Sequence, residues 1–454
     1  MIVPRFRLLF WIAAVFLPFS ILAAVVPSTV FFSLGAALIL VVIAVVDATF
    51  SLGNLSGIQV ELPATVRFSK GKEGVIALRI KNESMKSRRL RLSLAFPLQI
   101  YSPRRELIVY LPKENLYSSV SWPCKGLKQG KYNLDKCYLE TISNFGFWAI
   151  RGISSINTEI RVYPNLLVES KNLSALFLNR GVGIHSQRQV GKGRDFEQLR
   201  EYIPGDSYED IHWKATAKRG QPITKVFQIE RTQVVYVVID ASRLSARRAY
   251  SVNPKGPSRK EDSLFYTTIL ERYITAALVL GLAAEKQGDL FGLLIFDDRV
   301  QRFAGAKNGR AHFNVCRDML YTLQPNSVSP DYSELFTFIG TRIRRRSLLL
   351  FLTHLDDPVL AQNFTKNIDI ISRRHLVLVN TLRPAGAKPV FSSPGVESAD
   401  ELYQKLGGGI LWQSLRETEK VLRRLGAVFS MMDNETLCTE LISKYLSVKK
   451  RQIL

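Results

Sequence analysis

The side chains best placed for chemistry are carboxylates that follow apolar runs in the second half of the chain. Asp240, Asp297 and Asp356 each lie within a few residues of the end of such a run. Three convergent carboxylates could hold a divalent metal ion that activates water, and the matching activity would be that of a metal-dependent hydrolase. Metal–oxygen bonds are about 2 Å long, so carboxylates more than roughly 8 Å apart would exclude such a site. A hydrolase near Asp240 is therefore one hypothesis.

Other catalytic signatures are missing from the sequence. Gly191-Lys192-Gly193 is only a fragment of a phosphate-binding loop, and no Gly-x-Ser-x-Gly nucleophile elbow occurs. The five histidines are scattered, without the i, i+4 spacing that places two rings on one helix face. The four cysteines contain no Cys-x-x-Cys pair, which argues against zinc and thioredoxin-like chemistry. We therefore expect a protein that is not an enzyme.

An alternation of apolar strands and helices must position the carboxylates. Continuous apolar runs suit parallel strands that are buried on both faces, and five such runs occur at 233–239, 290–296, 347–352, 376–381 and 427–431. Helical spacing of the residues between them predicts helices at 263–287, 308–323, 332–344, 358–373, 411–425 and 434–447. This pattern predicts a doubly wound α/β domain over 233–448, in which ligands gather beyond the carboxyl ends of the strands.

Local signals set the expected limits of helices and loops in this domain. Ser263 is a candidate N-cap for the first helix, and Gly407-Gly408-Gly409 is expected to terminate a helix. The polar stretch 243–262 contains proline and glycine and predicts a loop over the carboxyl edge of the sheet.

Residues 57–164 have a different character. Short alternating runs separated by turn residues predict an all-β, sandwich-like module, which could be a spacer or a protein-interaction module. Cys124 and Cys137 lie in this module, and a disulfide between them is geometrically possible. In a reducing cytosol we expect free thiols instead.

The chain begins with a long uncharged stretch. Residues 8–46 carry no charged side chain and divide at Pro27-Ser28 into 8–26 and 29–46. Each piece is close to the ~20 residues that cross a bilayer, so residues 1–52 are predicted to form a transmembrane helical hairpin. A cleaved signal peptide is the alternative interpretation.

The charges beside this hairpin predict its orientation. Arg5 and Arg7 precede the first span, and no basic residue lies in the turn. The positive-inside rule then places the N-terminus in the cytoplasm, and two crossings return the soluble part to that side of a bacterial inner membrane. A cell-envelope protein that acts outside is the alternative, and labelling of Cys124 from the periplasm would distinguish the two.

The net charge of +23 limits the kind of partner. Basic residues are spread along the chain, with small clusters at 344–346 and 449–451. Zinc-finger spacing, RNA-recognition aromatic motifs and basic-zipper patterns are absent from the sequence, so nucleic acid is not an expected partner. Attraction to the anionic lipids of the cytoplasmic leaflet fits the charge better.

Residues 165–232 form a linker that ends in a charged and aromatic segment. Its candidate partner-binding residues are Arg200, Glu201, Tyr202, Pro204, Gly205, Asp206, Trp213 and Lys214. We expect a turn at 204–206, a helix or an extended arm at 195–202, and a short helix at 210–217 that Asp210 caps and whose Trp213 faces inward. The charges could neutralise one another and clamp the segment onto the next domain, or they could form a docking surface for a partner protein.

This segment resembles the domain of unknown function family number 58. The resemblance rests on the LREYIPGD run at 199–206, the IHWKATAK run at 211–218, and Asp240-Ala241-Ser242 at a strand end. It extends to the two N-terminal spans, the β module and a C-terminal domain similar to von Willebrand factor A. The resemblance implies a MoxR-type AAA+ ATPase as partner, and hence an adaptor role in protein or complex maturation.

The same resemblance implies a degenerate cation site. Von Willebrand A domains bind a divalent cation through an Asp-x-Ser-x-Ser motif, a threonine and a further aspartate. Asp240 and Ser242 match this motif, Ser245 lies one place beyond the expected second serine, and His354 replaces the further aspartate, with Asp356 two residues on. The threonine cannot be assigned from the sequence. Mg²⁺ binding at such a site is expected to be weak, and no other cofactor is expected.

Overall fold

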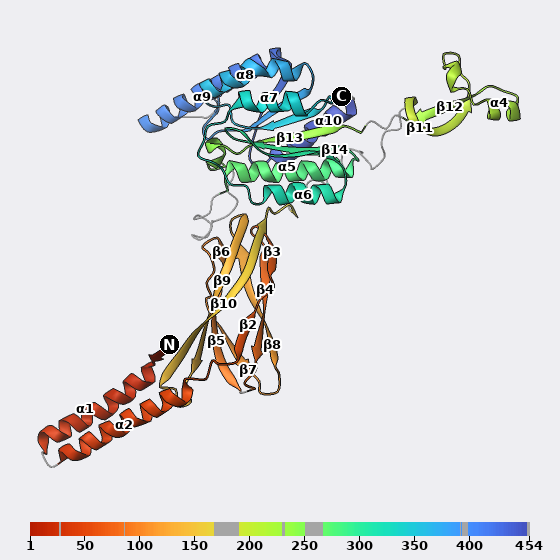
Figure 1. The fold of residues 1–454 in the computed structure, drawn as a ribbon. Helices are drawn as coiled ribbons and strands as arrows, with labels where there is room; N and C mark the ends of the chain where they lie inside the picture. The colour runs from red at the N-terminus through yellow and green to blue at the C-terminus, as the bar shows by residue number, and fades with distance from the viewer. Residues whose placement is uncertain are drawn as a thin grey trace. The chain divides into compact units, whose positions relative to one another are not determined.

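The computed structural model describes residues 1–26, 29–85, 87–167, 190–228, 232–249, 267–390, 392 and 398–451. The chain divides into two compact units, Met1–Asn165 and Leu166–Leu454 (Figure 1). The first unit contains apolar helices and antiparallel sheets, and the second contains a mixed, mostly parallel sheet with helices.

The first unit begins with strand β1 (Ile2–Pro4) and two apolar helices, α1 (Phe6–Val25) and α2 (Val30–Ser51). Among the described residues, α2 is the one helix long and apolar enough to cross a membrane, and a shorter apolar stretch, Phe6–Leu22, precedes it. The predicted second span ended at residue 46 because Asp47 carries a charge. The helix continues to Ser51 because the side chain of Asp47 is buried and bonded within the unit.

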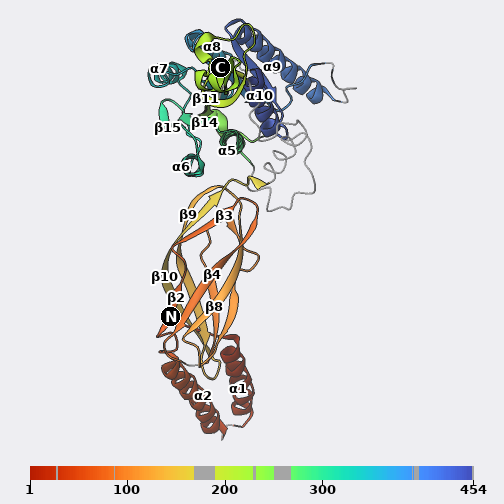
Figure 2. The same cartoon turned by 90° about the vertical axis from the view of Figure 1, so that its right-hand side faces the viewer.

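The β module that follows contains two sheets around one core. One sheet has the order β2-β4-β8-β6, and the other has the order β1-β10-β9-β5-β7, with β3 parallel to β10. The strands are β2 (Ile58–Glu61), β3 (Thr65–Ser69), β4 (Glu73–Asn82), β5 (Arg88–Leu94), β6 (Ile100–Tyr101), β7 (Leu107–Leu111), β8 (Tyr117–Gly126), β9 (Gly130–Ile142) and β10 (Trp148–Tyr163). Figure 2 shows the long strands lying side by side along the module.

Alternating side chains fill the space between these two sheets. Ile76 and Leu78 of β4, Trp122 of β8 and Ile160 of β10 are fully buried in the shared core, while their neighbours along each strand face outward. Cys124 and Cys137 are free thiols, as predicted, and all four cysteines are buried. Burial raises the pKa of the Cys124 thiol to about 12.

The second unit contains a six-stranded sheet in the order β15-β14-β13-β16-β17-β18. Its strands are β13 (Val234–Asp240), β14 (Leu290–Phe296), β15 (Val300–Lys307), β16 (Leu348–Leu352), β17 (Leu376–Leu382) and β18 (Ala427–Met432). The five predicted strands are confirmed and run parallel, while β15 pairs antiparallel at the edge. The sequence prediction missed β15 because its side chains are mostly half-buried and lack a continuous apolar run.

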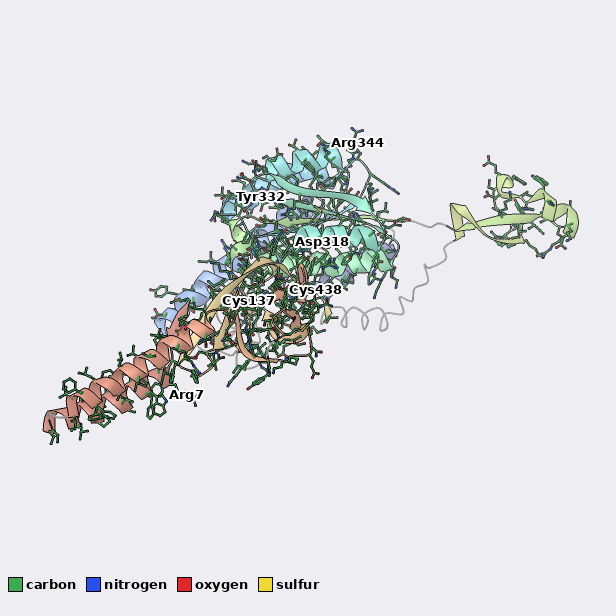
Figure 3. The ribbon with its side chains drawn as sticks, turned by 60° about the horizontal axis from the view of Figure 1, so that its bottom comes forward. Arg7, Cys137, Asp318, Tyr332, Arg344 and Cys438 are labelled. Carbon is green, nitrogen blue, oxygen red and sulfur yellow. The ribbon has the colours of Figure 1, made fainter. Side chains whose placement is uncertain are left out.

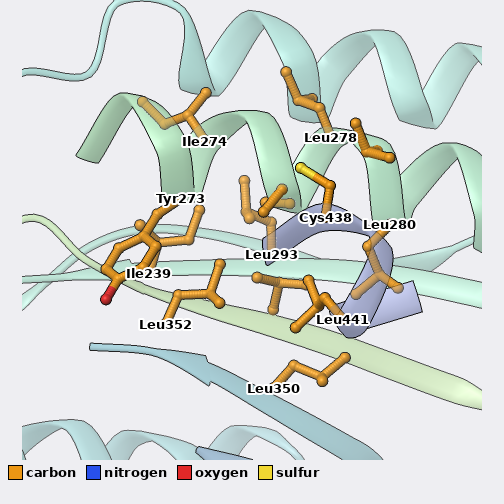
Figure 4. Close-up of a cluster of buried hydrophobic side chains, with 14 of the residues drawn as sticks. Ile239, Tyr273, Ile274, Leu278, Leu280, Leu293, Leu350, Leu352, Cys438 and Leu441 are labelled. Carbon is orange, nitrogen blue, oxygen red and sulfur yellow. The ribbon is translucent and has the colours of Figure 1, made fainter. Parts of the chain in front are cut away.

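Helices cover both faces of this sheet. In β13, Val235, Val237 and Ile239 pack towards α5 (Ile269–Lys286), α6 (Arg310–Leu320) and α10 (Leu437–Arg451), as the cluster in Figure 4 shows in part. The intervening Val234 and Val238 pack towards the opposite helices, which are α7 (Tyr332–Arg342), α8 (Pro358–Ser372) and α9 (Ala399–Arg424). This two-sided burial explains why the strand reads as an unbroken apolar run.

Three local predictions require correction or fall outside the described residues. Helix α5 is capped by Thr268, whose hydroxyl accepts from the Glu271 N–H, whereas the predicted cap Ser263 lies outside the described residues. Of the predicted loop 243–262, residues 243–249 are described and include the short helix η3 (Arg243–Ala246), and the remainder lies outside.

The glycine run 407–409 does not end a helix, because it lies inside α9. A Cβ added at Gly408 would lie 2.1 Å from the carbonyl oxygen of Gly386. Gly408 therefore lets the preceding loop approach the helix backbone closely, which explains a glycine there without a helix terminus.

Candidate functional site

The carboxyl edge of the sheet brings together several of the predicted residues. Asp240 ends β13, and Thr353 directly follows β16, the neighbouring strand. The strand order reverses here, because β14 lies on one side of β13 and β16 on the other. In open α/β sheets such a reversal point is where ligands bind.

Asp240 is held by hydrogen bonds within the protein. One carboxylate oxygen accepts from the Ser242 N–H at 2.9 Å, and the other accepts from the Thr353 hydroxyl at 2.7 Å. Burial raises the pKa of Asp240 above its ordinary value, and the nearby charge of Asp297 acts in the same direction, while the bonds from Ser242 and Thr353 oppose it. Thr353, which directly precedes His354 in the loop after β16, was not among the predicted site residues.

Two tyrosines and a histidine continue this buried network. The Tyr332 hydroxyl lies 3.0 Å from the Thr353 hydroxyl, and the Tyr273 hydroxyl lies 2.9 Å from Nδ1 of His354. Burial lowers the pKa of His354 to about 4, so the ring is neutral at pH 7. Sequence reasoning placed Tyr273 only in the apolar stripe of its helix and did not single out Tyr332, since nothing in the spacing of either tyrosine indicates where its hydroxyl binds.

The other candidate cation ligands have partners within the protein. The Ser245 hydroxyl donates to the Ser242 carbonyl at 2.8 Å, and Asp356 pairs with the guanidinium of Arg247. Within the described residues no group of three or more histidine, cysteine or acidic side chains could hold a metal. These contacts engage the Ser245 hydroxyl and place a guanidinium cation against the Asp356 carboxylate, while Ser242 is buried.

Asp297, the third carboxylate of the hydrolase hypothesis, is likewise engaged. Its oxygens accept from the side-chain amides of Asn326 at 2.6 Å and Gln301 at 2.9 Å. Burial alone would raise the pKa of Asp297, but these hydrogen bonds outweigh it and lower the pKa. The carboxylates of this edge therefore act as hydrogen-bond acceptors that hold loops in place.

Residues 190–228 form a small lobe. Strands β11 (Val190–Glu201) and β12 (Ile223–Gln228) pair antiparallel, with η2 (Tyr208–Asp210) and α4 (Trp213–Arg219) between them. The stretch 195–202 is therefore extended for most of its length and not helical. The helix α4 is capped by His212, whose Nδ1 accepts from the Ala215 N–H at 2.9 Å, and not by Asp210 as predicted.

The predicted turn organises the first half of the lobe. Asp206 accepts from the Ile203 N–H at 3.1 Å and from the Arg200 guanidinium at 2.6 Å, and Gly205 adopts a φ of +111°. The backbone bond from Ile203, followed by the contact with Arg200, lowers the pKa of Asp206. In the part of this lobe whose side chains are described, Lys214 makes no ion pair, so the predicted charge network reduces to Arg200–Asp206.

The aromatic residues of the lobe face solvent. Trp213 is 69% exposed, contrary to the predicted inward orientation, because α4 has only two turns and no buried residue. Tyr208 is 75% exposed and stacks on the ring of Tyr202 at a centroid distance of 6.0 Å. Ile203 is exposed as well. The lobe thus presents an apolar, aromatic surface beside the Arg200–Asp206 pair.

Comparison with known proteins finds a family match over part of the chain. Residues 198–388 match the family described as "Protein of unknown function DUF58", which confirms the predicted resemblance over this range. A search of curated proteins finds no match.

Several solved structures are similar to parts of the chain. An aerotolerance-related membrane protein from Bacteroides fragilis shares 10% sequence identity at a TM-score of 0.28, covering 48% of this chain and 100% of that chain. An uncharacterised membrane-spanning protein from Vibrio fischeri shares 12% identity at a TM-score of 0.20, covering 48% of this chain and 99% of that chain. Proximal thread matrix protein 1 from the mussel byssus shares 11% identity at a TM-score of 0.25, covering 47% and 44% respectively.

Proposed function

We propose that this protein is a membrane-anchored adaptor that presents a docking surface to a MoxR-type AAA+ ATPase during protein or complex maturation. In this proposal the two N-terminal helices span a bacterial inner membrane, and the soluble part lies in the cytoplasm. The α/β domain is similar to von Willebrand factor A and has no catalytic role of its own.

The apolar surface of the helices supports the anchor. Helix α2 has 22 residues, which corresponds to about 33 Å and matches the hydrocarbon core of a bilayer. Large apolar side chains of both helices face outward, among them Leu17 and Ile21 of α1 and Leu38 and Val42 of α2. Exposure of such an apolar surface to water is unfavourable, whereas in a bilayer the same surface contacts lipid chains.

The topology of the sheet supports the proposed domain type. Numbered from β13, the strand order is 3-2-1-4-5-6, with the third strand antiparallel at the edge. Asp240 and Ser242 then lie at the reversal point, at the end of the first strand. In this chain their hydrogen bonds order the loops of the edge, which suits a scaffold better than a catalyst.

The exposed aromatic surface of the lobe is the observation that carries the proposed docking role. Tryptophan, tyrosine and arginine are the residues that most often dominate the energy of protein interfaces, and Trp213, Tyr208 and Arg200 occur together here. A two-stranded sheet is only marginally stable in water. A partner that covers this surface would therefore both bind the lobe and stabilise it.

Photo-crosslinking in native membranes tests this proposal. A benzophenone amino acid replaces Trp213 in the full-length protein, and the matched control carries it at Tyr403, which is equally exposed on α9. We expect an AAA+ ATPase among the products from position 213, enriched at least tenfold over position 403, with and without Mg²⁺. Crosslinks from position 213 that reach only a second copy of this chain, or that match those from position 403, would contradict the adaptor role.

A further inference from the structure

We propose that the end of the β module next to α2 binds the headgroups of anionic phospholipids. The surface consists of the turn 143–148 together with the guanidinium groups of Arg5 and Arg7. This inference rests on the proposed membrane anchor and adds a lipid class and a binding surface to it.

A buried carboxylate fixes this turn to α2. Asp47, in the last turns of the helix, accepts from the Ser143 hydroxyl at 2.6 Å and from the Phe145 N–H at 3.1 Å. The indole N–H of Trp148 donates to the Ala44 carbonyl at 2.8 Å, one turn earlier. Three hydrogen bonds therefore hold the turn at one level of the helix, near its carboxyl end.

The start of α1 is fixed to the same turn. Strand β1 pairs with the beginning of β10, where Pro4 lies opposite Trp148. The Arg5 N–H then donates to the Phe147 carbonyl at 2.9 Å, directly before the first residue of α1. The entry of the first helix and the exit of the second are thereby held against one turn.

Both guanidinium groups lie at this turn. A Cβ added to Gly146 would lie 3.1 Å from Nη1 of Arg7 and 3.8 Å from Nη1 of Arg5. Figure 3 labels Arg7 on the helix that begins there. Among the described residues, no ion pair includes Arg5 or Arg7. Two cationic forks are thus available to accept a phosphate, whose oxygens they match in geometry.

The surroundings of these cations point to a lipid surface. Phe145 is 59% exposed at the tip of the turn, Phe6 is exposed beside Arg5, and Phe50 is exposed at the end of α2. This aromatic rim continues directly into the apolar surface of the two helices. Aromatic rings with polar or cationic neighbours are typical of the headgroup level of a bilayer. A protein partner with acidic groups would match the cations but would not cover the adjoining apolar helices.

Further basic residues lie at this end of the module, together with the acidic Glu83 and Glu114. Arg88 and Arg89 begin β5 next to the end of β7, and Lys113 follows that strand, so these residues share the end with Ile142 of β9. Each basic group near the surface increases the affinity for a membrane with anionic lipids about fivefold.

Depth-dependent quenching tests the placement of the turn. The full-length protein is reconstituted in nanodiscs, and a fluorophore is attached to Phe145→Cys, to Val42→Cys in α2 or to Ile153→Cys on β10. The four native cysteines are buried and do not compete. Position 153 is exposed and about 17 Å along β10 from Trp148. We expect headgroup-level quenchers to act strongly at position 145, acyl-chain quenchers at position 42, and neither at position 153.

A matched pair of charge variants tests the lipid class. Arg5→Gln/Arg7→Gln is compared with Arg104→Gln/Arg105→Gln, which removes two exposed arginines from the loop before β7, beyond the end of β5 away from Arg88. Binding of a fluorescent phosphatidylglycerol is measured in detergent by competition, with phosphatidylcholine as the neutral probe. We expect about thirtyfold weaker phosphatidylglycerol binding for the first variant only, from the two charges that it removes.

The outcomes separate this inference from the anchor on which it rests. An unquenched label at position 42 would overturn both the anchor and the lipid surface. A quenched label at position 42 with an unquenched label at position 145 would overturn the lipid surface alone. Equal losses in the two charge variants, or an equal loss for phosphatidylcholine, would likewise overturn it.

Discussion

At the scale of single residues, Thr353 determines how the carboxylate of Asp240 is satisfied. Its hydroxyl donates to Asp240 at 2.7 Å and lies 3.0 Å from the Tyr332 hydroxyl. Thr353→Val keeps the shape but leaves a buried carboxylate oxygen without its donor, so we expect a loss of about 1–3 kcal/mol in the free energy of unfolding. Thermal unfolding of the purified protein in detergent measures this loss.

Thr341→Val provides the control for this substitution. Thr341 is exposed on α7, and its hydroxyl donates only to carbonyls of its own helix. We expect a change within about 0.5 kcal/mol. Comparable losses in the two variants would mean that the bond to Asp240 has no special weight.

The burial of His354 should make the free energy of unfolding depend on pH. Burial lowers the pKa of His354 from 6.5 to about 4, so folding favours the neutral ring. The resulting stabilisation is complete above pH 6.5 and is lost as the pH falls from 6.5 towards 4. Its full size is roughly 3 kcal/mol. His354→Gln removes the titrating group, so the difference in stability between wild type and variant should shrink from pH 7.5 to pH 4.5.

The comparison with the variant is needed because a second histidine behaves alike. Burial also lowers the pKa of His375 to about 4, and that residue destabilises the folded state in the same pH window. His375 titrates in both proteins and cancels in the difference. A difference between wild type and His354→Gln that stays constant with pH would contradict the burial of a neutral His354.

At the scale of elements, α9 offers a test of close packing. Gly408→Ala would place a Cβ 2.1 Å from the Gly386 carbonyl oxygen, and backbone must move to relieve this contact. We expect a loss of about 1–3 kcal/mol, which is typical of overpacking. Gly407→Ala is the matched control, since its Cβ would meet nothing within 4 Å, and it should stabilise the helix by roughly 0.5–1 kcal/mol. Denaturant unfolding of both variants measures whether each substitution lowers or raises the free energy of unfolding.

The sequence predicted those elements whose burial is two-sided or strictly alternating. Every residue of strand β13 is buried, and β4 alternates buried and outward-facing side chains. A continuous apolar run and an alternating apolar pattern in the sequence therefore predicted these two strands. The sequence-based prediction was wrong where a contact with a distant part of the chain determines the local structure. The run 407–409 has the composition of a helix stop, and only the loop at Gly386 explains why a helix continues through it.

The candidate sites were less predictable than the elements. The position of Asp240 at a strand end followed from its apolar run, but Thr353, which donates to its carboxylate, lies more than one hundred residues away in sequence. Trp213 was expected to face inward because large aromatic side chains are usually buried. Its exposure depends on how little of the lobe covers α4, and residue types do not encode that.

At the scale of the whole molecule, two apolar helices precede a β module and an α/β unit with an exposed lobe. The net charge of +23 and the basic residues beside the helices fit an anionic inner leaflet. A MoxR-type partner requires ATP, which is available in the cytoplasm. The side of the membrane on which the second unit lies is therefore decisive for the proposed function.

Sidedness labelling tests this central claim most directly. Tyr403→Cys introduces one exposed thiol in the second unit, while the four native cysteines are buried. A membrane-impermeant maleimide is applied to intact spheroplasts and to inverted membrane vesicles that carry the full-length variant. The account predicts labelling in inverted vesicles and at least tenfold less in intact spheroplasts. Strong labelling of intact spheroplasts would place the second unit outside the cytoplasm and contradict the proposed adaptor.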